Sequence, residues 1–365
     1  MCGFFGWIAI GDAHKARPLS HQCQRAIIQE LKLRGRDGFG LIDEPGQFLA
    51  HSRLAIRGDE KDAAQPFETP NSSRLILFNG EIYSMKGAGQ TELKSRGDTY
   101  ALKKALDTQD TDTTLKRLNG MFAIAILDKA LKQLTLGVDY FGQKPLFYGM
   151  AKSAIIFGST AQLVALALDD LTSSREIDKK ILTHYLMYGF PHPEQTIWKN
   201  IQKVPPGGRV SINLQTCTVQ TNSEFQETNE YLRDESTEPN NLDTSITEAV
   251  HRHMISDHPV GMCLSGGIDS SLVASKLPER LIAFSVDDKS PQSEIEQARL
   301  YANQLALPFV TCDLTNQDFS NFFNLANSCL DEPHADSAIV SSAALFDKAR
   351  RQVKVVLTGD GGDEL

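Results

Sequence analysis

Apolar and polar positions alternate in two different ways along the chain, and the change falls near residue 240. In the first part, short apolar segments are separated by polar turns, a pattern typical of antiparallel β-hairpins. These segments are 39–43, 48–56, 74–80, 121–128, 133–139, 146–150 and 154–159. The last four form two pairs with short turns between the partners. The first part is therefore predicted to be a hairpin-rich α+β domain.

Two stretches of this first part favour helices. The stretch 20–35 places Ile27 and Leu31 on one helix face and ends at Gly35, a residue type that commonly follows a helix. A second helix is expected over 176–189. After it, the sequence IQKVPPGGRVSI predicts a turn that leads into a strand.

The polar, acidic stretch QTNSEFQETNEYLRDESTEPNN separates the two parts, and its few aliphatic residues favour a linker. Beyond it, helical patterns alternate with the apolar strand patterns 260–264, 281–286, 309–314 and 353–359. This alternation predicts a parallel sheet in a doubly wound α/β domain. We expect a first domain over 2–215, a linker over 216–240 and a second domain over 241–365.

Composition narrows the class of protein. Of the 365 residues, 41% are hydrophobic and 23% charged, and no apolar run is long enough to span a membrane. The sequence GDAHKARP interrupts the apolar start, which argues against a signal peptide and favours a cytoplasmic location. A net charge of −9 argues against nucleic acid as a partner. Six cysteines without CxxC spacing indicate a reducing compartment rather than zinc or a disulfide framework.

The most specific local pattern is VGMCLSGGIDSS, residues 260–271. An apolar strand runs into two glycines, and a helix is expected to begin near Asp269. Backbone N–H groups and serine hydroxyls in such a loop point at an anion along the helix dipole, which suits a pyrophosphate. The loop has neither the Walker A nor the GxGxxG pattern. The alternative is a Gly-Gly turn capped by Ser and Asp.

The stretch LTGDGGDEL, residues 357–365, follows the last predicted strand. Its glycines free the backbone, while Asp360, Asp363 and Glu364 offer the oxygen ligands that Mg²⁺ prefers. The alternative is an acidic surface turn.

The loop SGGIDSS resembles the PP-loop of ATP pyrophosphatases. Together with DEPHADSAIV and VVLTGDGGDEL, it resembles the synthetase domain of glutamine-hydrolysing asparagine synthetases. The resemblance implies ATP and Mg²⁺, with Mg²⁺ held by Asp269 and Asp363, and Asp360 supporting an acyl-adenylate. The implied nucleotide-binding residues are Leu264, Ser265, Gly266, Gly267, Asp269, Ser270, Val286, Thr358 and Gly359.

The thiol of Cys2 raises the question of a nucleophile. No convincing Cys/His/Asp set is visible, since His14, His21 and His51 are more simply explained as structural or exposed. If Met1 is removed, which the small side chain at position 2 permits, Cys2 carries its own base. A free α-amine has a pKa of about 7.7 to 8.

Further motifs follow in a fixed order. HSRLAIR offers the Arg53 guanidinium for a carboxylate, FNGEIY offers Asn79 and Gly80 as oxyanion donors, and RGDTY places Asp98 to receive an ammonium. With MCGFFG, LRGRDGFG, LNGMFAIAILD and FGQKPLFYG, they resemble the class II N-terminal-nucleophile amidotransferase domain. The resemblance implies an αββα sandwich.

The implied roles make Cys2 the nucleophile that forms a thioester with glutamine and releases ammonia, with Asn79 and Gly80 at the oxyanion. The implied glutamine-binding residues are Arg53, Leu54, Ala55, Ile56, Arg57, Asn79, Gly80, Glu81 and Asp98. The sequence departs from the family pattern at Arg36, where proline is usual. It also lacks the basic residues usual around the aspartate of GVDYFGQKP, and it has SRGD where the family often has a serine before the aspartate.

The sequence thus predicts a glutamine-hydrolysing asparagine synthetase that uses glutamine, aspartate and ATP, with a homodimer as one expectation. The alternatives are an amidotransferase acting on another carboxyl acceptor, such as a surface sugar or secondary metabolite, and a glutaminase or regulatory fragment with an inactive synthetase half. A non-enzymatic binding module is the third alternative, and it predicts that Cys2→Ala has no effect.

Overall fold

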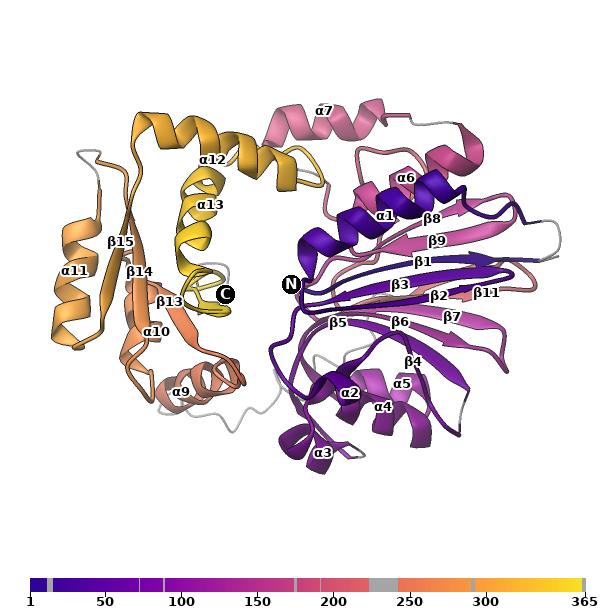
Figure 1. Cartoon of the computed structure of the whole chain (residues 1–365), viewed down its shortest axis with the longest axis horizontal. Helices are drawn as coiled ribbons and strands as arrows, with labels where there is room; N and C mark the ends of the chain where they lie inside the picture. The colour runs from indigo at the N-terminus through magenta and orange to yellow at the C-terminus, as the bar shows by residue number, and fades with distance from the viewer. Residues whose placement is uncertain are drawn as a thin grey trace. The chain divides into compact units, whose positions relative to one another are not determined.

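The computed structural model describes residues 1–11, 16–71, 73–87, 89–173, 176–190, 192–222, 242–289 and 293–362. The chain forms two compact units. The first contains Met1–Glu230 together with Asp331–His334, and the second contains Tyr231–Leu330 together with Ala335–Leu365. Figure 1 colours the chain from indigo at its start to yellow at its end.

The first unit contains two six-stranded sheets with antiparallel pairing. One sheet has the order β10-β8-β9-β1-β3-β2, with β1 (Gly3–Ala9), β2 (Gly38–Glu44), β3 (Gln47–Arg53), β8 (Phe147–Ala151), β9 (Ala154–Gly158) and β10 (Ile201–Lys203). The other has the order β12-β11-β7-β6-β5-β4, with β4 (Phe67–Glu68), β5 (Arg74–Met85), β6 (Leu118–Asp128), β7 (Gln133–Val138), β11 (Arg209–Asn213) and β12 (Val219–Asn222). The predicted hairpins are β6-β7 and β8-β9.

Helices cover the outer faces of both sheets (Figure 1). A buried core that includes Phe4, Leu77 and Phe157 fills the space between the sheets. Helices α1 (His21–Arg34) and α6 (Ala161–Thr172) pack on the sheet that contains β1, and α3 (Gln90–Ser95), α4 (Asp98–Thr108) and α5 (Thr111–Lys116) pack on the other. Among the described residues of this unit, the other helices are α2 (Glu60–Ala63) and α7 (Lys179–Tyr188). The layers confirm the predicted αββα sandwich.

Local capping explains where two predicted helices begin and end. The Ser20 hydroxyl accepts a hydrogen bond from Cys23 N at 3.2 Å, and α1 ends before Gly35 as predicted. Helix α7 begins at Lys179, later than the expected 176, because the Asp178 carboxylate accepts from Lys180 N at 2.8 Å. Its end at Tyr188 precedes Gly189, which has φ 80°.

Part of the stretch expected as a linker is folded. Strand β12 pairs antiparallel with β11, from Ile212 opposite Val219 to Arg209 opposite Asn222. All of its residues are exposed, so the apolar alternation that marks other strands is missing here. The rest of the expected linker, from residue 223, lies outside the described residues.

The second unit contains a four-stranded parallel sheet of order β15-β14-β13-β16. The strands are β13 (Val260–Cys263), β14 (Ile282–Asp287), β15 (Phe309–Asp313) and β16 (Val355–Leu357). One face packs against α9 (Leu242–His253), α10 (Ile268–Ser275) and α11 (Ile295–Gln304), and the other against α12 (Asn316–Cys329) and α13 (Ala338–Ala349). The order reverses between β13 and β16, which makes their carboxyl ends a topological switch point. The predicted doubly wound α/β architecture is confirmed.

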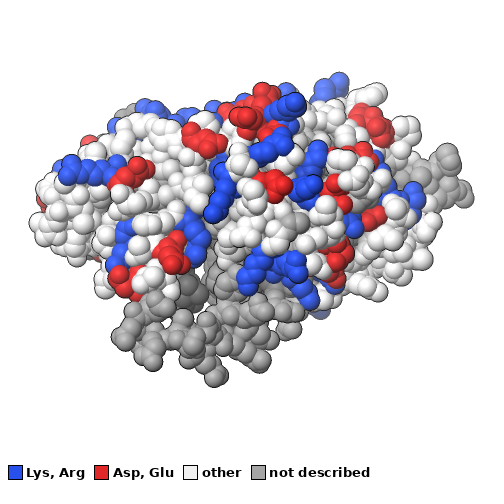
Figure 2. All heavy atoms as spheres, turned by 90° about the horizontal axis from the view of Figure 1, so that it is seen from below, with Lys and Arg blue, Asp and Glu red and all other residues white. Residues whose placement is uncertain are grey.

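Acidic and basic side chains are interspersed on the molecular face shown in Figure 2. Among the described residues, no helix combines the length and the apolar character that a membrane crossing requires.

Candidate active site

Cys2 lies immediately before β1, beside the segment that follows β3. Gly3 is paired with Ser52, and this register brings Leu54 next to Cys2. Leu54 N donates a hydrogen bond to Cys2 Sγ at 3.3 Å, and the thiol lies 3.6 Å from Leu54 O. The backbone of residue 54 therefore fixes the position of the thiol.

The thiol and the chain terminus have opposite acid-base tendencies. Burial is the main cause that raises the pKa of the Cys2 thiol, which disfavours the thiolate. Burial is also the main cause that lowers the pKa of the Met1 amine to about 6, and the cations of Arg34 and Lys144 lower it further. A neutral thiol needs a base to become a nucleophile, and a neutral amine can accept that proton.

Asn79 and Gly80 lie on β5, which contacts β1 of the other sheet. Asn79 is 1% exposed, yet its amide nitrogen has no hydrogen-bond partner among the described residues. A Cβ at Gly80 would lie 2.1 Å from Met121 O, so only glycine fits this close approach to β6. The strand therefore holds a buried donor without an acceptor, as an oxyanion site requires before substrate binds.

His51 belongs to the packing rather than to the chemistry. It is 1% exposed, and its Nε2 lies 3.0 Å from Phe78 O, linking β3 of one sheet to β5 of the other. Burial lowers the pKa of His51 to about 4. His21 is exposed on α1, and His14 lies outside the described residues.

Two carboxyl groups, Glu81 on β5 and Asp98 at the start of α4, form an acid pair near the thiol. Asp98 accepts from Ile82 N at 3.1 Å and from Thr99 N at 2.7 Å. Burial raises the pKa of both carboxyls, and the Asp98 charge raises that of Glu81 further. Because the two side chains are hydrogen-bonded, the pair holds at least one proton.

The loop after β3 contains the other predicted glutamine-binding residues. Arg53 Nη2 donates to Gly58 O at 2.6 Å and to Arg57 O at 3.2 Å. Arg57 donates to the carbonyl of Ile82 on β5 at 3.1 Å, and its charge favours ionised Asp98. Leu54, Ala55 and Ile56 are half-buried between the two arginines. Arg53 thus stabilises this loop by hydrogen bonds to its carbonyls. The sequence predicted only that its guanidinium would bind a substrate carboxylate.

A buried aspartate explains one departure of the sequence from the family pattern. Asp139 is fully buried, and its carboxylate accepts hydrogen bonds from four backbone N–H groups. The donors are Phe122 at 3.1 Å, Phe141 at 3.2 Å, Gln143 at 3.0 Å and Lys144 at 3.0 Å. These donors satisfy the charge without a basic side chain on either side. The sequence motif contained this aspartate, but its role depends on a turn that the motif does not specify.

The predicted phosphate loop connects β13 to α10. Gly266 has φ 95°, a conformation that favours glycine, and Gly267 precedes the helix. The Ser265 hydroxyl accepts from Gly267 N at 3.2 Å and lies 3.0 Å from the Ser270 hydroxyl. The hydroxyl of Ser271 is buried without a partner among the described residues. The N–H groups at the start of α10 and this hydroxyl suit an anion.

The segment after β16 lies against the start of α10. A Cβ at Gly359 would lie 2.7 Å from Ser270 N, and one at Gly362 would lie 2.8 Å from the Asp269 carboxylate oxygens. Leu264 is buried at the end of β13, and Val286 is on the neighbouring strand β14. Thr358 and Asp360 flank Gly359. The described residues of the predicted nucleotide-binding group therefore lie at the carboxyl ends of β13, β14 and β16.

The metal prediction is only partly described. Asp269 supplies a carboxylate beside the glycines of the second motif, while Asp363 lies outside the described residues. Within the described ranges, no group of three or more His, Cys, Asp or Glu side chains is arranged to hold a metal. One carboxylate beside a phosphate loop fits Mg²⁺ that is carried mainly by phosphates.

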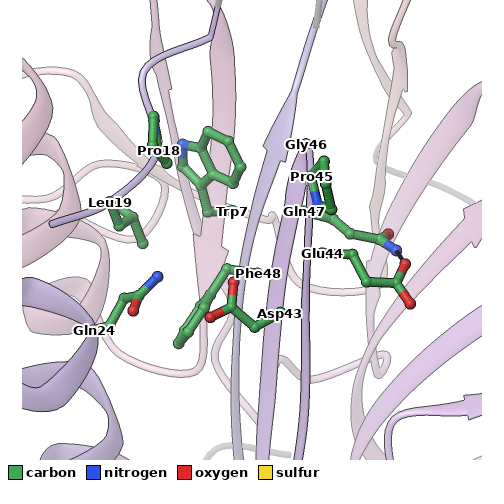
Figure 3. Close-up of a pocket in the computed structure, with 10 residues that line it drawn as sticks. All are labelled: Trp7, Pro18, Leu19, Gln24, Asp43, Glu44, Pro45, Gly46, Gln47 and Phe48. Carbon is green, nitrogen blue, oxygen red and sulfur yellow. Dashed lines mark hydrogen bonds between the residues drawn. The ribbon is translucent and has the colours of Figure 1, made fainter. Parts of the chain in front are cut away.

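A cavity of about 290 Å³ lies elsewhere in the first unit (Figure 3). Trp7, Leu19 and Phe48 line it together with Asp43 and Glu44 from the β2-β3 hairpin. The predicted glutamine-binding residues are not among its lining residues.

Comparison with known proteins decides the family. The model of the glutamine amidotransferase domain matches residues 1–224, and that of asparagine synthase matches residues 241–365. The chain belongs to the glutamine amidotransferase family. The two matches in this order confirm the predicted resemblance to glutamine-hydrolysing asparagine synthetases.

Curated relatives agree with this family. The chain is 29% identical, over its whole length, to asparagine synthetase [glutamine-hydrolyzing] 1 of Bacillus subtilis, and it covers 58% of that protein. It is 26% identical to putative asparagine synthetase [glutamine-hydrolyzing] 2 of Methanocaldococcus jannaschii. This match covers all of this chain and 75% of that protein. A solved glutamine phosphoribosylpyrophosphate amidotransferase from B. subtilis is a looser match, with TM-score 0.40, 17% identity, and coverage of 85% of this chain and 66% of that chain.

Proposed function

We propose that this amidotransferase is a glutamine-hydrolysing asparagine synthetase. It converts ATP, aspartate, glutamine and water into AMP, pyrophosphate, asparagine and glutamate. The proposal is supported by the half-buried Cys2 thiol, which accepts a hydrogen bond from Leu54 N at 3.3 Å, in a unit where the buried Asn79 amide nitrogen has no partner among the described residues. This observation carries the glutaminase half of the proposal.

The glutaminase half begins once Met1 is removed. The Cys2 α-amine accepts the thiol proton, and the sulfur attacks the amide carbon of glutamine. Asn79 and Gly80 donate to the oxyanion that forms. The amine then returns its proton to the departing nitrogen, so ammonia leaves and a thioester remains. Water hydrolyses the thioester to glutamate and restores the thiol.

Charge complementarity supports a position for the α-amino and α-carboxylate groups of glutamine. The α-ammonium of glutamine is the natural partner for Asp98 and Glu81, because it supplies the positive charge that lets both carboxyls ionise. Arg53 is the residue for the α-carboxylate, with Leu54 to Arg57 lining the pocket.

In the synthetase half, ATP binds at the loop formed by Ser265, Gly266 and Gly267. Asp269, with Asp363 as its expected partner, would hold Mg²⁺, which neutralises phosphate charge and favours pyrophosphate as leaving group. The β-carboxylate of aspartate attacks the α-phosphorus of ATP to give β-aspartyl-AMP. Ammonia then displaces AMP and forms the amide. Asp360 supports the adenylate.

The test is one reaction mixture analysed for several products. The chain, shown by intact mass to lack Met1, is incubated with ATP, Mg²⁺, aspartate and glutamine, and glutamate, AMP and asparagine are quantified. All three are expected in parallel. Glutamate without AMP would refute the synthetase half alone, and AMP formed only with another carboxyl acceptor would identify a different amidotransferase.

Matched cysteine variants test the nucleophile. Cys2→Ala is expected to abolish glutamate formation while leaving ammonia-dependent synthesis. Cys23→Ala is the control, because Cys23 is a buried free thiol whose sulfur contacts Leu166 O in the packing of α1. Retained glutaminase activity in Cys2→Ala would refute the mechanism.

We also propose a cytoplasmic location, since all six cysteines are free thiols. A homodimer remains a prediction, to be tested by sedimentation.

A further inference from the structure

The motif DEPHADSAIV contributed to the resemblance but has no role in the mechanism above. Its first residues lie in the connection between α12 and α13, two helices of the second unit. The contacts of Asp331–His334, however, place this segment in the first unit. The chain therefore leaves the second unit after Leu330, packs within the first unit, and returns to the second unit at Ala335.

The Asp331 carboxylate lies at the start of α6. Its two oxygens accept hydrogen bonds from Ala161 N and from Gln162 N, the latter at 2.7 Å. The first N–H groups of a helix have no partner within the helix. The Thr160 hydroxyl caps only one of them, Leu163 N, at 3.3 Å. Asp331 thus completes the cap of α6 from a distant part of the sequence.

Glu332 makes a second set of contacts. Its Oε2 lies 2.7 Å from Lys203 Nζ, and its Oε1 accepts from Ile197 N at 3.3 Å. The Glu332 side chain is 9% exposed and that of Lys203 is 18% exposed. Because either partner alone would leave a largely buried charge uncompensated, this ion pair specifies where the segment packs.

The start of α6 is connected to the strand that follows the nucleophile. The hydroxyl of Ser159 accepts from Phe4 N at 2.9 Å, and Ser159 N donates to Phe4 O at 3.0 Å. Arg34 Nε donates to the Cys2 carbonyl at 3.1 Å, and the Arg34 charge also acts on Asp331. The segment therefore packs near the part of the first unit where the proposed function releases ammonia.

We propose that Asp331 and Glu332 form an anchor that couples the two half-reactions: they bind the start of α6 and Lys203, and so keep ammonia release linked to ammonia use. The anchored segment continues into α12 on one side and into α13 on the other. Holding it restrains both helices and raises the effective concentration of one half at the other. This inference rests on the proposed function.

The test compares coupled synthesis with each half-reaction, using the full chain lacking Met1. Coupling is measured as glutamate formed per asparagine. The half-reactions are glutamine hydrolysis without ATP and asparagine synthesis from added ammonia. For Asp331→Asn and Glu332→Gln we expect the glutamate-to-asparagine ratio to rise about fivefold or more, while each half-reaction stays within about twofold of wild type.

The pH of the assay is set by the anchor itself. Burial is the main cause that raises the pKa of the Asp331 carboxyl to about 6, while hydrogen bonds from Gln162 N and Ala161 N lower it. The Glu332 charge also raises this pKa, and the Arg34 charge lowers it. The assays are therefore made at about pH 8, where the carboxyl is ionised and both oxygens accept.

Asp170→Asn is the matched control. The Asp170 carboxylate also lies at a helix start, where it accepts from Ser20 N at 2.9 Å, but both partners belong to the continuous part of the first unit. This variant is expected to lose stability in urea and to keep the wild-type ratio. Lys203→Met combined with Glu332→Gln should raise the ratio no further than either change alone, because the two charges act together.

Hydrogen exchange reads the anchor independently of activity. The amides of Ala161 and Gln162 are expected to exchange faster in Asp331→Asn, and at the wild-type rate in Asp170→Asn. An unchanged ratio in Asp331→Asn and Glu332→Gln, or an equal rise in Asp170→Asn, would overturn the proposal. Absence of AMP and asparagine in the wild-type chain would instead refute the proposed function itself.

Discussion

The unpartnered amide of Asn79 gives a prediction in which activity and stability respond differently. Its nitrogen is buried without a hydrogen-bond partner among the described residues. Leaving such a donor unpaired costs about 1–3 kcal/mol of folding free energy. Asn79→Ala removes this cost but also removes buried contacts, so we expect the free energy of unfolding to stay within about 1 kcal/mol of wild type.

The same substitution removes an oxyanion donor. Loss of one such donor typically lowers kcat by about 10²- to 10³-fold, or about 2.7–4 kcal/mol of transition-state stabilisation. We therefore expect glutamine hydrolysis by Asn79→Ala to fall by that factor with little change in KM. Glutamate release is measured at saturating glutamine, and unfolding is followed in urea.

Gln65 supplies the matched control. It is also buried, but its Oε1 accepts from Phe78 N at 2.6 Å, one residue before Asn79. Gln65→Ala leaves that N–H unpaired and should lower the free energy of unfolding by about 1–3 kcal/mol. If Asn79→Ala loses as much stability as Gln65→Ala and keeps its kcat, Asn79 is structural and its assignment to the oxyanion fails.

Three further substitutions test the acid pair, the nucleotide loop and the buried aspartate. Burial raises the pKa of Glu81 in the folded state, so the contribution of this group to stability is lost as pH rises from the unfolded pKa of about 4.3 toward the folded pKa. Relative to the wild type, Glu81→Gln should therefore be more stable at pH 8 than at pH 5. An equal difference from the wild type at both pH values would contradict this. Gly359→Ala places a Cβ 2.7 Å from Ser270 N and should lower the rate of ATP-pyrophosphate exchange at least about tenfold, without affecting glutamine hydrolysis. Equal loss of both activities would argue for general unfolding. Asp139→Asn removes a carboxylate oxygen that accepts backbone hydrogen bonds and should lower the free energy of unfolding in urea by about 3 kcal/mol. Asp178→Asn at the N-cap of α7 is the control and should lower it by about 1 kcal/mol. Equal losses in the two variants would show that the buried turn is unimportant.

Helices α4 and α6 were not predicted, although both bury apolar residues. A buried face with a periodic apolar pattern made other helices and strands predictable from the sequence. Helix α1 and the β6-β7 hairpin are examples, because their apolar residues face the cores. Strand β12 escaped prediction because its residues are all exposed, so no apolar alternation marks the strand that pairs with β11. Helix α7 was predicted to start too early, since the Asp178 cap is a local signal that the apolar pattern does not contain.

The candidate site divides in the same way. The motifs point to Cys2, Asn79 and Asp98 as candidate site residues, since each proposed role requires a residue type that a short pattern displays. The motifs gave no indication that the Arg53 guanidinium donates a hydrogen bond to the Gly58 carbonyl in the same loop.

The buried polar groups of the first unit show what the proposed chemistry costs the fold. Asn79 and Asp98 are almost fully buried on elements whose neighbouring residues fill an apolar core, and Glu81 shares a proton with Asp98. An apolar residue at each of these positions would favour folding more, because an unpaired donor and a desolvated carboxyl both oppose folding. Under the proposed function this cost has a purpose, since donors for an oxyanion act best when they are dry and already aimed. Under the proposed function, the oxyanion accepts the hydrogen bond that the Asn79 amide otherwise lacks, and the α-ammonium of glutamine pairs with the carboxyls of Glu81 and Asp98.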